Sequence, residues 1–223
     1  MSDRLRPGVL FDVDGTLVDT NYLHALAWSR AFREVGEWAP MNAIHRLIGM
    51  GGDQLVSRLL GKEHPEAAAA RPRYYRELAE DVRVLPQAAA LLRDLHQHGL
   101  LIVLATSAPA DELERIRTVI DADDVIDGQT TSDDIHESKP SPEVFETAMQ
   151  RFSIDPRRTL AVGDSIWDVR AARAAGIGCL TVESGGFSQH ELSEAGARQV
   201  YRDVAKIFDQ LHTSPLAQLS SGP

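Results

Sequence analysis

Short apolar segments alternate with helical patterns along most of this chain, and this alternation constrains the fold more than any other feature of its sequence. Apolar runs typical of buried strands occur at residues 7–18, 100–105, 159–163 and 178–182. Helical spacing fills the intervals at residues 87–98, 110–121, 142–152 and 166–175. Because strands joined through helices run parallel, the pattern predicts an α/β fold with a doubly wound parallel sheet. Ligands bind such sheets at the carboxyl ends of the strands.

An all-helical insertion separates the first apolar run from the rest of the predicted sheet. Helical patterns follow Asp19, at residues 21–35, 41–48, 53–60 and 65–80, with no strand pattern before Val84. We therefore predict an α/β core at residues 1–19 and 84–211, with a helical cap domain at residues 20–83. The tail at residues 212–223 is rich in Ser, Pro and Gln, and this composition predicts disorder.

Two aspartates stand together at the exit of the first run. Asp12 and Asp14 are one residue apart and precede Gly15 and Thr16. Alternate side chains of a strand share a side, so both carboxylates can project into one cleft. Such a pair repels unless a cation binds, and it is useful where one carboxylate attacks and the other transfers a proton. A solvated strand end or turn is the alternative interpretation for the pair taken alone.

Two further polar segments favour phosphate binding. Thr106 and Ser107 follow the second run and precede a helix, where hydroxyl and free backbone N–H groups suit phosphate oxygens. Helix capping is the alternative role of these two residues. Lys139 precedes Pro140 and a helical pattern that begins at Pro142, and a solvated surface lysine is its alternative interpretation.

A second pair of acidic residues follows the third run. Asp164 stands at the strand exit, and Asp168 comes four residues later in the first turn of a predicted helix. Residues four apart share one helix face, where like charges are unfavourable. A hard divalent cation explains this pairing, because Mg²⁺ prefers carboxylate oxygens together with water and substrate phosphate.

The four segments, in this order, resemble the signatures of the haloacid dehalogenase superfamily, specifically its phosphatase-like branch with a helical cap after the first strand (phosphoglycolate phosphatase or beta-phosphoglucomutase-like). The resemblance spans residues 8–185, and the ordered set is far more specific than any one motif. One departure is Ser138, where relatives often have glycine. The matching motifs are Asp12-Val13-Asp14-Gly15-Thr16, Thr106-Ser107, Lys139-Pro140 and Gly163-Asp164-Ser165-Ile166-Trp167-Asp168.

This resemblance implies a role for each catalytic position. Asp12 is expected to be the nucleophile that forms an aspartyl-phosphate, and Asp14 the general acid and base. Thr106 and Ser107 are expected to bind the phosphoryl group. Lys139 is expected to neutralise charge between nucleophile and phosphate.

The resemblance also implies a Mg²⁺ cofactor. Asp164 is expected to bind the ion together with Asp12 and the backbone carbonyl of Asp14. Asp168 is expected to support it directly or through water. The metal set predicted from the sequence is therefore Asp12, Asp14, Asp164 and Asp168.

The cap is expected to determine specificity, because the core motifs recognise only phosphate. His24 lies five residues after Asp19, a spacing seen in both phosphatases and phosphomutases of this branch, and is a candidate substrate contact. Gly51, in a glycine-rich turn between cap helices, is a second candidate, and a simple helix connection is its alternative role. Arg46 and Arg58 are either anion ligands or solvated cap residues.

Composition excludes several other classes of function. The 223 residues carry a net charge of −10 without a basic stripe, which argues against a nucleic-acid partner. No apolar run reaches the length of a membrane helix and no signal peptide is recognisable, so we expect a cytoplasmic protein without a membrane partner. A monomer or weak homodimer is expected. The single cysteine, Cys179, is expected to pack in the core.

The leading hypothesis is a Mg²⁺-dependent phosphatase acting on a small phosphorylated metabolite of the sugar phosphate or phosphoglycolate class. A phosphomutase of the beta-phosphoglucomutase type is the alternative, ranked second because residues 49–55 lack the Arg and Ser pattern usual in such mutases. Asp14 argues against dehalogenation, which does not need this acid. A non-catalytic regulator on the same fold is the remote alternative.

Overall fold

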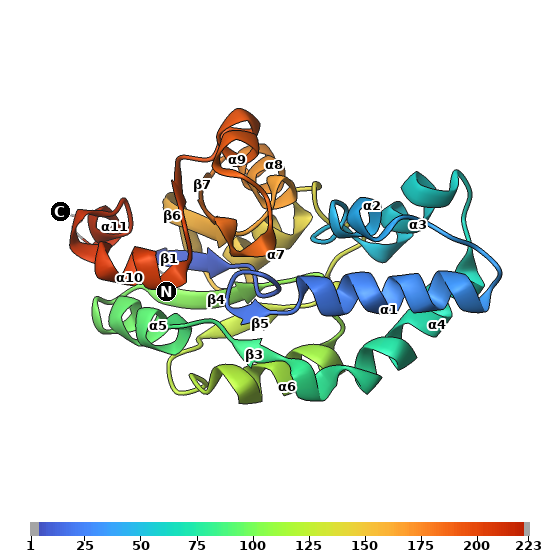
Figure 1. The fold of residues 1–223 in the computed structure, drawn as a ribbon. Helices are drawn as coiled ribbons and strands as arrows, with labels where there is room; N and C mark the ends of the chain where they lie inside the picture. Colours follow the sequence, from blue (N-terminus) through green and yellow to red (C-terminus); the bar gives the residue numbers. More distant parts are fainter. Residues whose placement is uncertain (1–4, 221–223) are drawn as a thin grey trace.

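A parallel sheet of six strands forms the centre of the molecule (Figure 1). The computed structural model describes residues 5–220. The strands are β1 (Arg6–Phe11), β4 (Leu101–Ala105), β5 (Gly128–Thr130), β6 (Ile154–Gly163), β7 (Gly178–Val182) and β8 (Gln199–Tyr201). Their order is β5-β4-β1-β6-β7-β8, and every neighbouring pair is parallel. The predicted α/β class with a doubly wound parallel sheet is confirmed.

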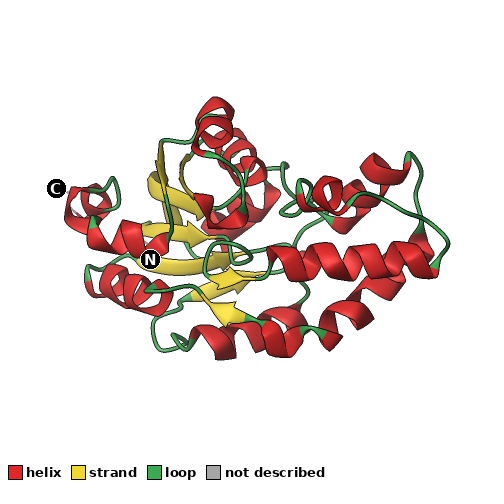
Figure 2. Ribbon diagram, in the orientation of Figure 1, coloured by secondary structure: helices red, strands yellow, loops and turns green. Residues whose placement is uncertain are grey.

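Helices cover both faces of this sheet (Figure 2). Along β1, Val9 and Phe11 belong to one apolar cluster and Leu10 belongs to the other, as the alternation of strand side chains requires. Burial on both faces explains why the strands are continuously apolar. The core helices are α5 (Ala88–Gln97), α6 (Ala110–Ile120), α7 (Glu143–Arg151), α8 (Ile166–Ala174), α9 (Gln189–Ala195), α10 (Val204–Asp209) and α11 (Ala217–Ser220). The first cluster includes residues of α5, α6, α10 and α11, and the second includes residues of α7 and α8.

Four helices between β1 and the rest of the core form the cap. They are α1 (Asn21–Glu34), α2 (Met41–His45), α3 (Gly52–Leu60) and α4 (Pro65–Glu77). The cap has an apolar cluster of its own, which includes Trp28 and Phe32 and joins the core through Trp167 of α8. A two-stranded antiparallel ribbon, β2 (Val18–Asp19) with β3 (Arg83–Val84), connects cap and core. In Figure 1 the cap lies beyond the ends toward which the strand arrows point.

The chain leaves the sheet directly after β1, which is shorter than the predicted run. The carbonyl of Val13 accepts hydrogen bonds from the backbone N–H groups of Thr16, Leu17 and Val18. Gly15 lies in this tight turn with a φ of +71°, a conformation that glycine adopts without strain. Asp12 and Asp14 therefore lie just beyond the end of β1, at the carboxyl edge of the sheet.

Several elements differ from the sequence-based expectation. Strand β6 begins at Ile154, earlier than the predicted start at residue 159, because its first residues pair with β1 beyond a register shift. Strands β5 and β8 were not predicted, since each has only three residues and little apolar periodicity. The short 3₁₀ helices are η1 (Ala79–Asp81), η2 (Ser132–Asp134), η3 (Glu183–Gly185) and η4 (Leu211–Thr213).

The predicted disorder of residues 212–223 is wrong for the part that the structure describes. Leu216 is fully buried and Leu219 is nearly so, and both join the apolar cluster of the first sheet face. Arg158 also donates a hydrogen bond of 3.1 Å to the backbone carbonyl of Leu219. The burial of these two leucines outweighs the polar composition of the segment. Leu219 lies in α11 and Leu216 in the turn just before it. Residues 221–223 lie outside the described part.

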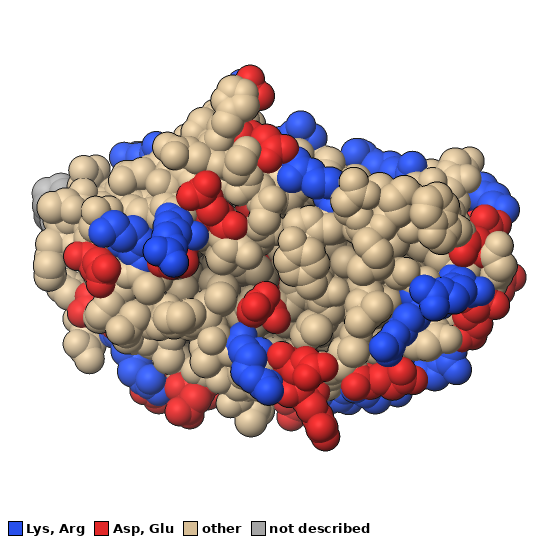
Figure 3. All heavy atoms as spheres, in the orientation of Figure 1, with Lys and Arg blue, Asp and Glu red and all other residues tan. Residues whose placement is uncertain are grey.

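Two features relate to the expectation of no nucleic-acid and no membrane partner: the distribution of surface charge and the composition of the helices. On the face shown in Figure 3, Lys and Arg side chains lie mostly beside Asp and Glu, and no continuous basic stripe crosses it. Within residues 5–220, no helix combines the length and the apolar composition that crossing a bilayer requires.

Candidate active site

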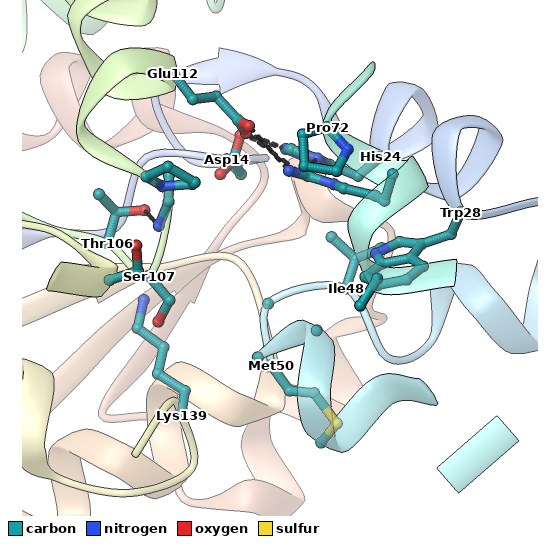
Figure 4. Close-up of a pocket in the computed structure, with 18 of the residues that line it drawn as sticks. Asp14, His24, Trp28, Ile48, Met50, Pro72, Thr106, Ser107, Glu112 and Lys139 are labelled. Atoms are coloured by element: carbon teal, nitrogen blue, oxygen red, sulfur yellow. Dashed lines mark hydrogen bonds and ion pairs between the residues drawn. The ribbon is translucent and has the colours of Figure 1, made fainter. Parts of the chain in front are cut away.

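A cavity of about 260 Å³ lies between the cap and the carboxyl ends of β1 and β4. Figure 4 shows its two sides, with Thr106, Ser107 and Lys139 opposite Trp28 and Met50. All the catalytic and phosphate-binding residues predicted from the sequence line it: Asp12, Asp14, His24, Gly51, Thr106, Ser107 and Lys139. Arg46 and Arg58 are not among its lining residues.

Lys139 and Asp12 form a buried ion pair at the floor of the site. The Nζ of Lys139 lies 2.5 Å from Oδ1 of Asp12 and 2.7 Å from Oδ1 of Asp168. Lys139 is only 1% exposed, so its interpretation as a solvated surface lysine is wrong. Burial raises the pKa of Asp12, Lys139 opposes this rise, and the neighbouring Asp168 and Asp14 add to it, which brings the pKa to about 7. Burial would lower the pKa of Lys139, but Asp12 and Asp168 outweigh it and raise the value.

Three buried carboxylates meet beside this pair. Ligand oxygens of Asp12, Asp164 and Asp168 lie within 4.8 Å of one another. Burial raises the pKa of Asp164 well above its usual range, and Asp12 and Asp168 add to this effect. One buried lysine does not neutralise three carboxylates, so this donor set fits a hard divalent cation. The side chain of Asp14 is not part of this trio.

Asp168 has two roles that the sequence pattern did not separate. Helix α8 begins at Ile166, with Ser165 as its N-cap, so Asp164 precedes the helix instead of sharing its face with Asp168. Oδ2 of Asp168 accepts hydrogen bonds from the N–H and the hydroxyl of Ser165 in a capping box. Its Oδ1 remains directed at Lys139. The cap of α8 therefore holds Asp168 in place beside the lysine.

Asn21 joins the cap to the acidic trio and was missed by the sequence analysis. This buried first residue of α1 donates hydrogen bonds from Nδ2 to Oδ2 of Asp164 at 2.7 Å and to the carbonyl of Gly185 at 3.2 Å. A Cβ added to Gly185 would lie 1.6 Å from Oδ2 of Asp164, so this close approach requires glycine. Asparagine is common at the start of a helix as a capping residue, so the sequence around Asn21 does not indicate a contact with Asp164.

Asp14 is held by Thr20, which precedes cap helix α1, and by His24 within that helix. Its Oδ1 accepts a hydrogen bond of 2.5 Å from the hydroxyl of Thr20 and lies 2.9 Å from Nε2 of His24. Burial alone would raise the pKa of Asp14, but His24, Thr20 and Arg71 outweigh it and lower the pKa to about 2. His24 therefore contacts the expected general acid, in addition to lining the cavity.

The two hydroxyl residues after β4 have different partners. Oγ1 of Thr106 accepts a hydrogen bond of 3.0 Å from the N–H of Ala108. Oγ of Ser107 is buried without a hydrogen-bond partner. Helix α6 has Pro109 as its N-cap and no side-chain cap, so neither residue caps it. An unpaired buried hydroxyl in the cavity wall is available to a ligand oxygen.

A second ion pair, partly buried, crosses from cap to core and was also missed by the sequence analysis. Arg71 of α4 donates two hydrogen bonds to the carboxylate of Glu112 in α6, at 2.9 and 3.2 Å. Arg71 also contacts Nδ1 of His24 and lies over the ring of Tyr75, which stacks on His24. Both charged residues line the cavity. Only the packing of α4 against the core reveals them, because each belongs to an ordinary helical pattern.

The departure at Ser138 has a structural counterpart in the cap. Its backbone carbonyl accepts a hydrogen bond of 3.2 Å from Nε2 of Gln54 in α3. This contact uses the backbone and not the side chain of Ser138. The serine therefore leaves Lys139 in the buried position described above.

Comparisons with known proteins agree with this geometry. A family model for haloacid dehalogenase-like hydrolases matches residues 7–176. The chain is 34% identical over 188 residues to phosphoglycolate phosphatase of Yersinia pestis. This aligned region covers 80% of this chain and 81% of that protein. It is 28% identical over 215 residues to protein CbbY of Cereibacter sphaeroides, and this alignment covers 89% of this chain and 93% of that protein. A solved hydrolase from Pseudomonas syringae has a TM-score of 0.87 and 30% identity, covering 93% of this chain and 99% of that one. The resemblance carried by the four motifs is thus confirmed, and this chain belongs to the haloacid dehalogenase-like hydrolases, as a member of their phosphatase-like branch.

Proposed function

We propose that this protein is a Mg²⁺-dependent phosphatase that hydrolyses a small phosphorylated metabolite, of the sugar phosphate or phosphoglycolate class, through an aspartyl-phosphate. The observation that carries this proposal is the pairing of buried Asp12 with Lys139, beside Asp164 and Asp168 and in one cavity with Asp14. The similarity to a phosphoglycolate phosphatase supports the substrate class.

In the first step, a carboxylate oxygen of Asp12 attacks phosphorus, and the bond from phosphorus to the ester oxygen breaks. Asp14 donates a proton to that leaving oxygen. Lys139 neutralises the nucleophile and the oxygens that gain charge, while Ser107 and Thr106 are placed to bind phosphoryl oxygens. Bound Mg²⁺, held by Asp12, Asp164, Asp168 and the carbonyl of Asp14, would supply further charge neutralisation to the phosphoryl group.

In the second step, water attacks the phosphorus of the aspartyl-phosphate and the bond to Asp12 breaks. Asp14, deprotonated by the first step, accepts the proton of that water and is restored for the next cycle. The lowered pKa of Asp14 in the free protein keeps this carboxylate ionised, which is the protonation state that a base requires. The acid role requires that substrate raise this pKa, as the approach of a phosphate dianion does.

The decisive test is phosphate release from sugar phosphates, phosphoglycolate, nucleotides and p-nitrophenyl phosphate, with Mg²⁺ or EDTA. We expect release that requires Mg²⁺ and that Asp12→Asn abolishes, whereas Asp19→Asn, an exposed aspartate of β2, retains it. Release that persists in Asp12→Asn would overturn the nucleophile assignment. Conversion of glucose 1-phosphate without phosphate release would instead establish the phosphomutase.

A further inference from the structure

The cap side of the cavity is largely apolar. Trp28, Ile48, Met50, Ala68 and Pro72 line it, and Figure 4 shows Trp28 and Ile48 across the cavity from Thr106 and Ser107. The cavity volume of about 260 Å³ lies below the ~300–1,000 Å³ of sites for drug-sized ligands. A phosphate group together with a compact leaving group fills such a space.

Each cation of the cavity lining already has a carboxylate partner. Lys139 pairs with Asp12, and Arg71 pairs with Glu112 through two hydrogen bonds. His24 contacts Asp14. Counting permanent charges, the lining has three carboxylates (Asp12, Asp14 and Glu112) and two cations (Arg71 and Lys139).

A second anionic group on the substrate would therefore need to displace Glu112 from Arg71. The side chains of Arg71 and Glu112 are 14% and 9% exposed, so a displaced Glu112 carboxylate would lose its cation in a poorly solvated place. Arg46 cannot substitute, since it pairs with Glu191 outside the cavity and lies over Phe187. Arg58 likewise lies outside the lining, over Trp167.

We infer that the substrate is a small phosphate monoester whose leaving group carries no second negative charge, and that the Arg71–Glu112 pair is the specificity determinant. This inference rests on the proposed function and narrows its substrate class. Glu112 neutralises the one arginine among the described lining residues, so a second anion on the substrate would meet no unpaired cation there. The apolar cap residues then contact the carbon skeleton of the leaving group.

Two ligands of matched size separate charge from shape. Phosphoglycolate and 2-hydroxyethyl phosphate differ in that one ends in a carboxylate and the other in a hydroxymethyl group. Their affinities for Asp12→Asn, measured by calorimetry with Mg²⁺ at neutral pH, report binding without turnover. We expect 2-hydroxyethyl phosphate to bind at least about tenfold more tightly. Equal binding, or tighter binding of phosphoglycolate, would overturn the inference.

Glu112→Gln in the Asp12→Asn background tests the assigned pair. Loss of this carboxylate leaves Arg71 without its partner, so the affinity for phosphoglycolate should rise about tenfold while that for 2-hydroxyethyl phosphate changes less than about threefold. Retained binding of 2-hydroxyethyl phosphate also shows that the variant is folded. Glu114→Gln removes the same charge from an exposed position of α6 and should leave both affinities unchanged. An unchanged affinity ratio in Glu112→Gln would contradict the assignment.

The proposed function is tested separately, by turnover of the wild-type protein. If the wild-type protein releases no phosphate from 2-hydroxyethyl phosphate or from p-nitrophenyl phosphate, the phosphatase assignment fails. The affinity ratio is read without hydrolysis, so the two failures are distinguishable. Binding of neither ligand to Asp12→Asn would overturn the substrate inference.

Discussion

Nε2 of His24 lies 2.9 Å from Oδ1 of Asp14, so the first helix of the cap directly contacts the proposed general acid. The ring of Tyr75 stacks on the imidazole of His24, and the guanidinium of Arg71 contacts its Nδ1. The ionisation of Asp14 therefore depends on how the cap is seated. This contact couples the position of the cap to the pKa of Asp14.

His24→Asn should raise the pKa of Asp14 above about 2. Burial, which raises this pKa, remains in the variant, whereas the largest of the opposing interactions is lost. Titration of the Asp14 carboxyl carbon by ¹³C NMR measures the value. His96→Asn, on the core surface, should leave the Asp14 titration unchanged. The same pKa in His24→Asn and the wild-type protein would refute the coupling.

Lys139→Met should lower both activity and stability. Removal of a buried cation leaves Asp12 and Asp168 close together without their partner, which typically costs about 3–5 kcal/mol in the free energy of unfolding. Loss of one charge-stabilising group also lowers kcat by roughly 10²–10³-fold. Urea unfolding and phosphate release measure the two effects, and Lys206→Met on the exposed surface of α10 is the control. Near wild-type values of both would exclude a structural and a catalytic role for Lys139.

Without a divalent cation, the stability of the protein should fall as pH rises from about 4 to about 7. The pKa of Asp12 is raised from 3.8 to about 7, so the folded protein binds more protons than the unfolded chain across this window. One such proton corresponds to a slope of at most about 1.4 kcal/mol per pH unit. The pKa of Asp164 is also raised, so this carboxyl lowers the stability with rising pH in the same way. Thermal unfolding in EDTA measures the slope.

Mg²⁺ should reverse this loss at pH 7.5 by favouring the ionised carboxylates. The expected outcome is a rise in Tm that grows with Mg²⁺ concentration. Asp164→Asn, which removes one proposed ligand charge, should reduce the rise. A Tm that does not change with Mg²⁺ concentration at any pH would contradict the assignment of the acidic trio as a metal site.

Asn21→Ala should weaken Mg²⁺ binding by about 10–100-fold, the usual cost of losing a group that orients a metal ligand. The reason is the hydrogen bond of 2.7 Å from Asn21 to Asp164. Calorimetric titration of Mg²⁺ measures the affinity. Asn42→Ala, at an exposed position of α2, should bind Mg²⁺ like the wild-type protein. Equal affinities in the two variants would show that the hydrogen bond does not position Asp164.

Leu216→Ala should destabilise the core by about 2–5 kcal/mol, as expected for a fully buried leucine. Urea unfolding measures the change. Gln218→Ala, at an exposed position of the short helix α11 that follows Leu216, should change stability by less than about 0.5 kcal/mol. A neutral Leu216→Ala would mean that the C-terminal segment does not contribute to the folded core.

The sequence determined the elements whose cause is local or periodic. Strands β1, β4 and β7 and the helices of the cap follow from continuous apolar runs and 3.6-residue spacing. Asp12, Asp14 and Lys139 were identifiable because strand ends and an ordered set of motifs mark them. Strands β5 and β8 were not, since three residues on an edge of the sheet carry too little pattern.

The tertiary structure alone decided the partners of those residues. Asn21 and Asp164 are 143 residues apart, and Arg71 and Glu112 are 41 apart, so no local pattern relates them. Buried Leu216 likewise acquires its role from a sheet face built by distant strands. Local preference acts over a few residues, whereas these contacts exist only once the cap is seated on the sheet and burial makes each polar group find a partner.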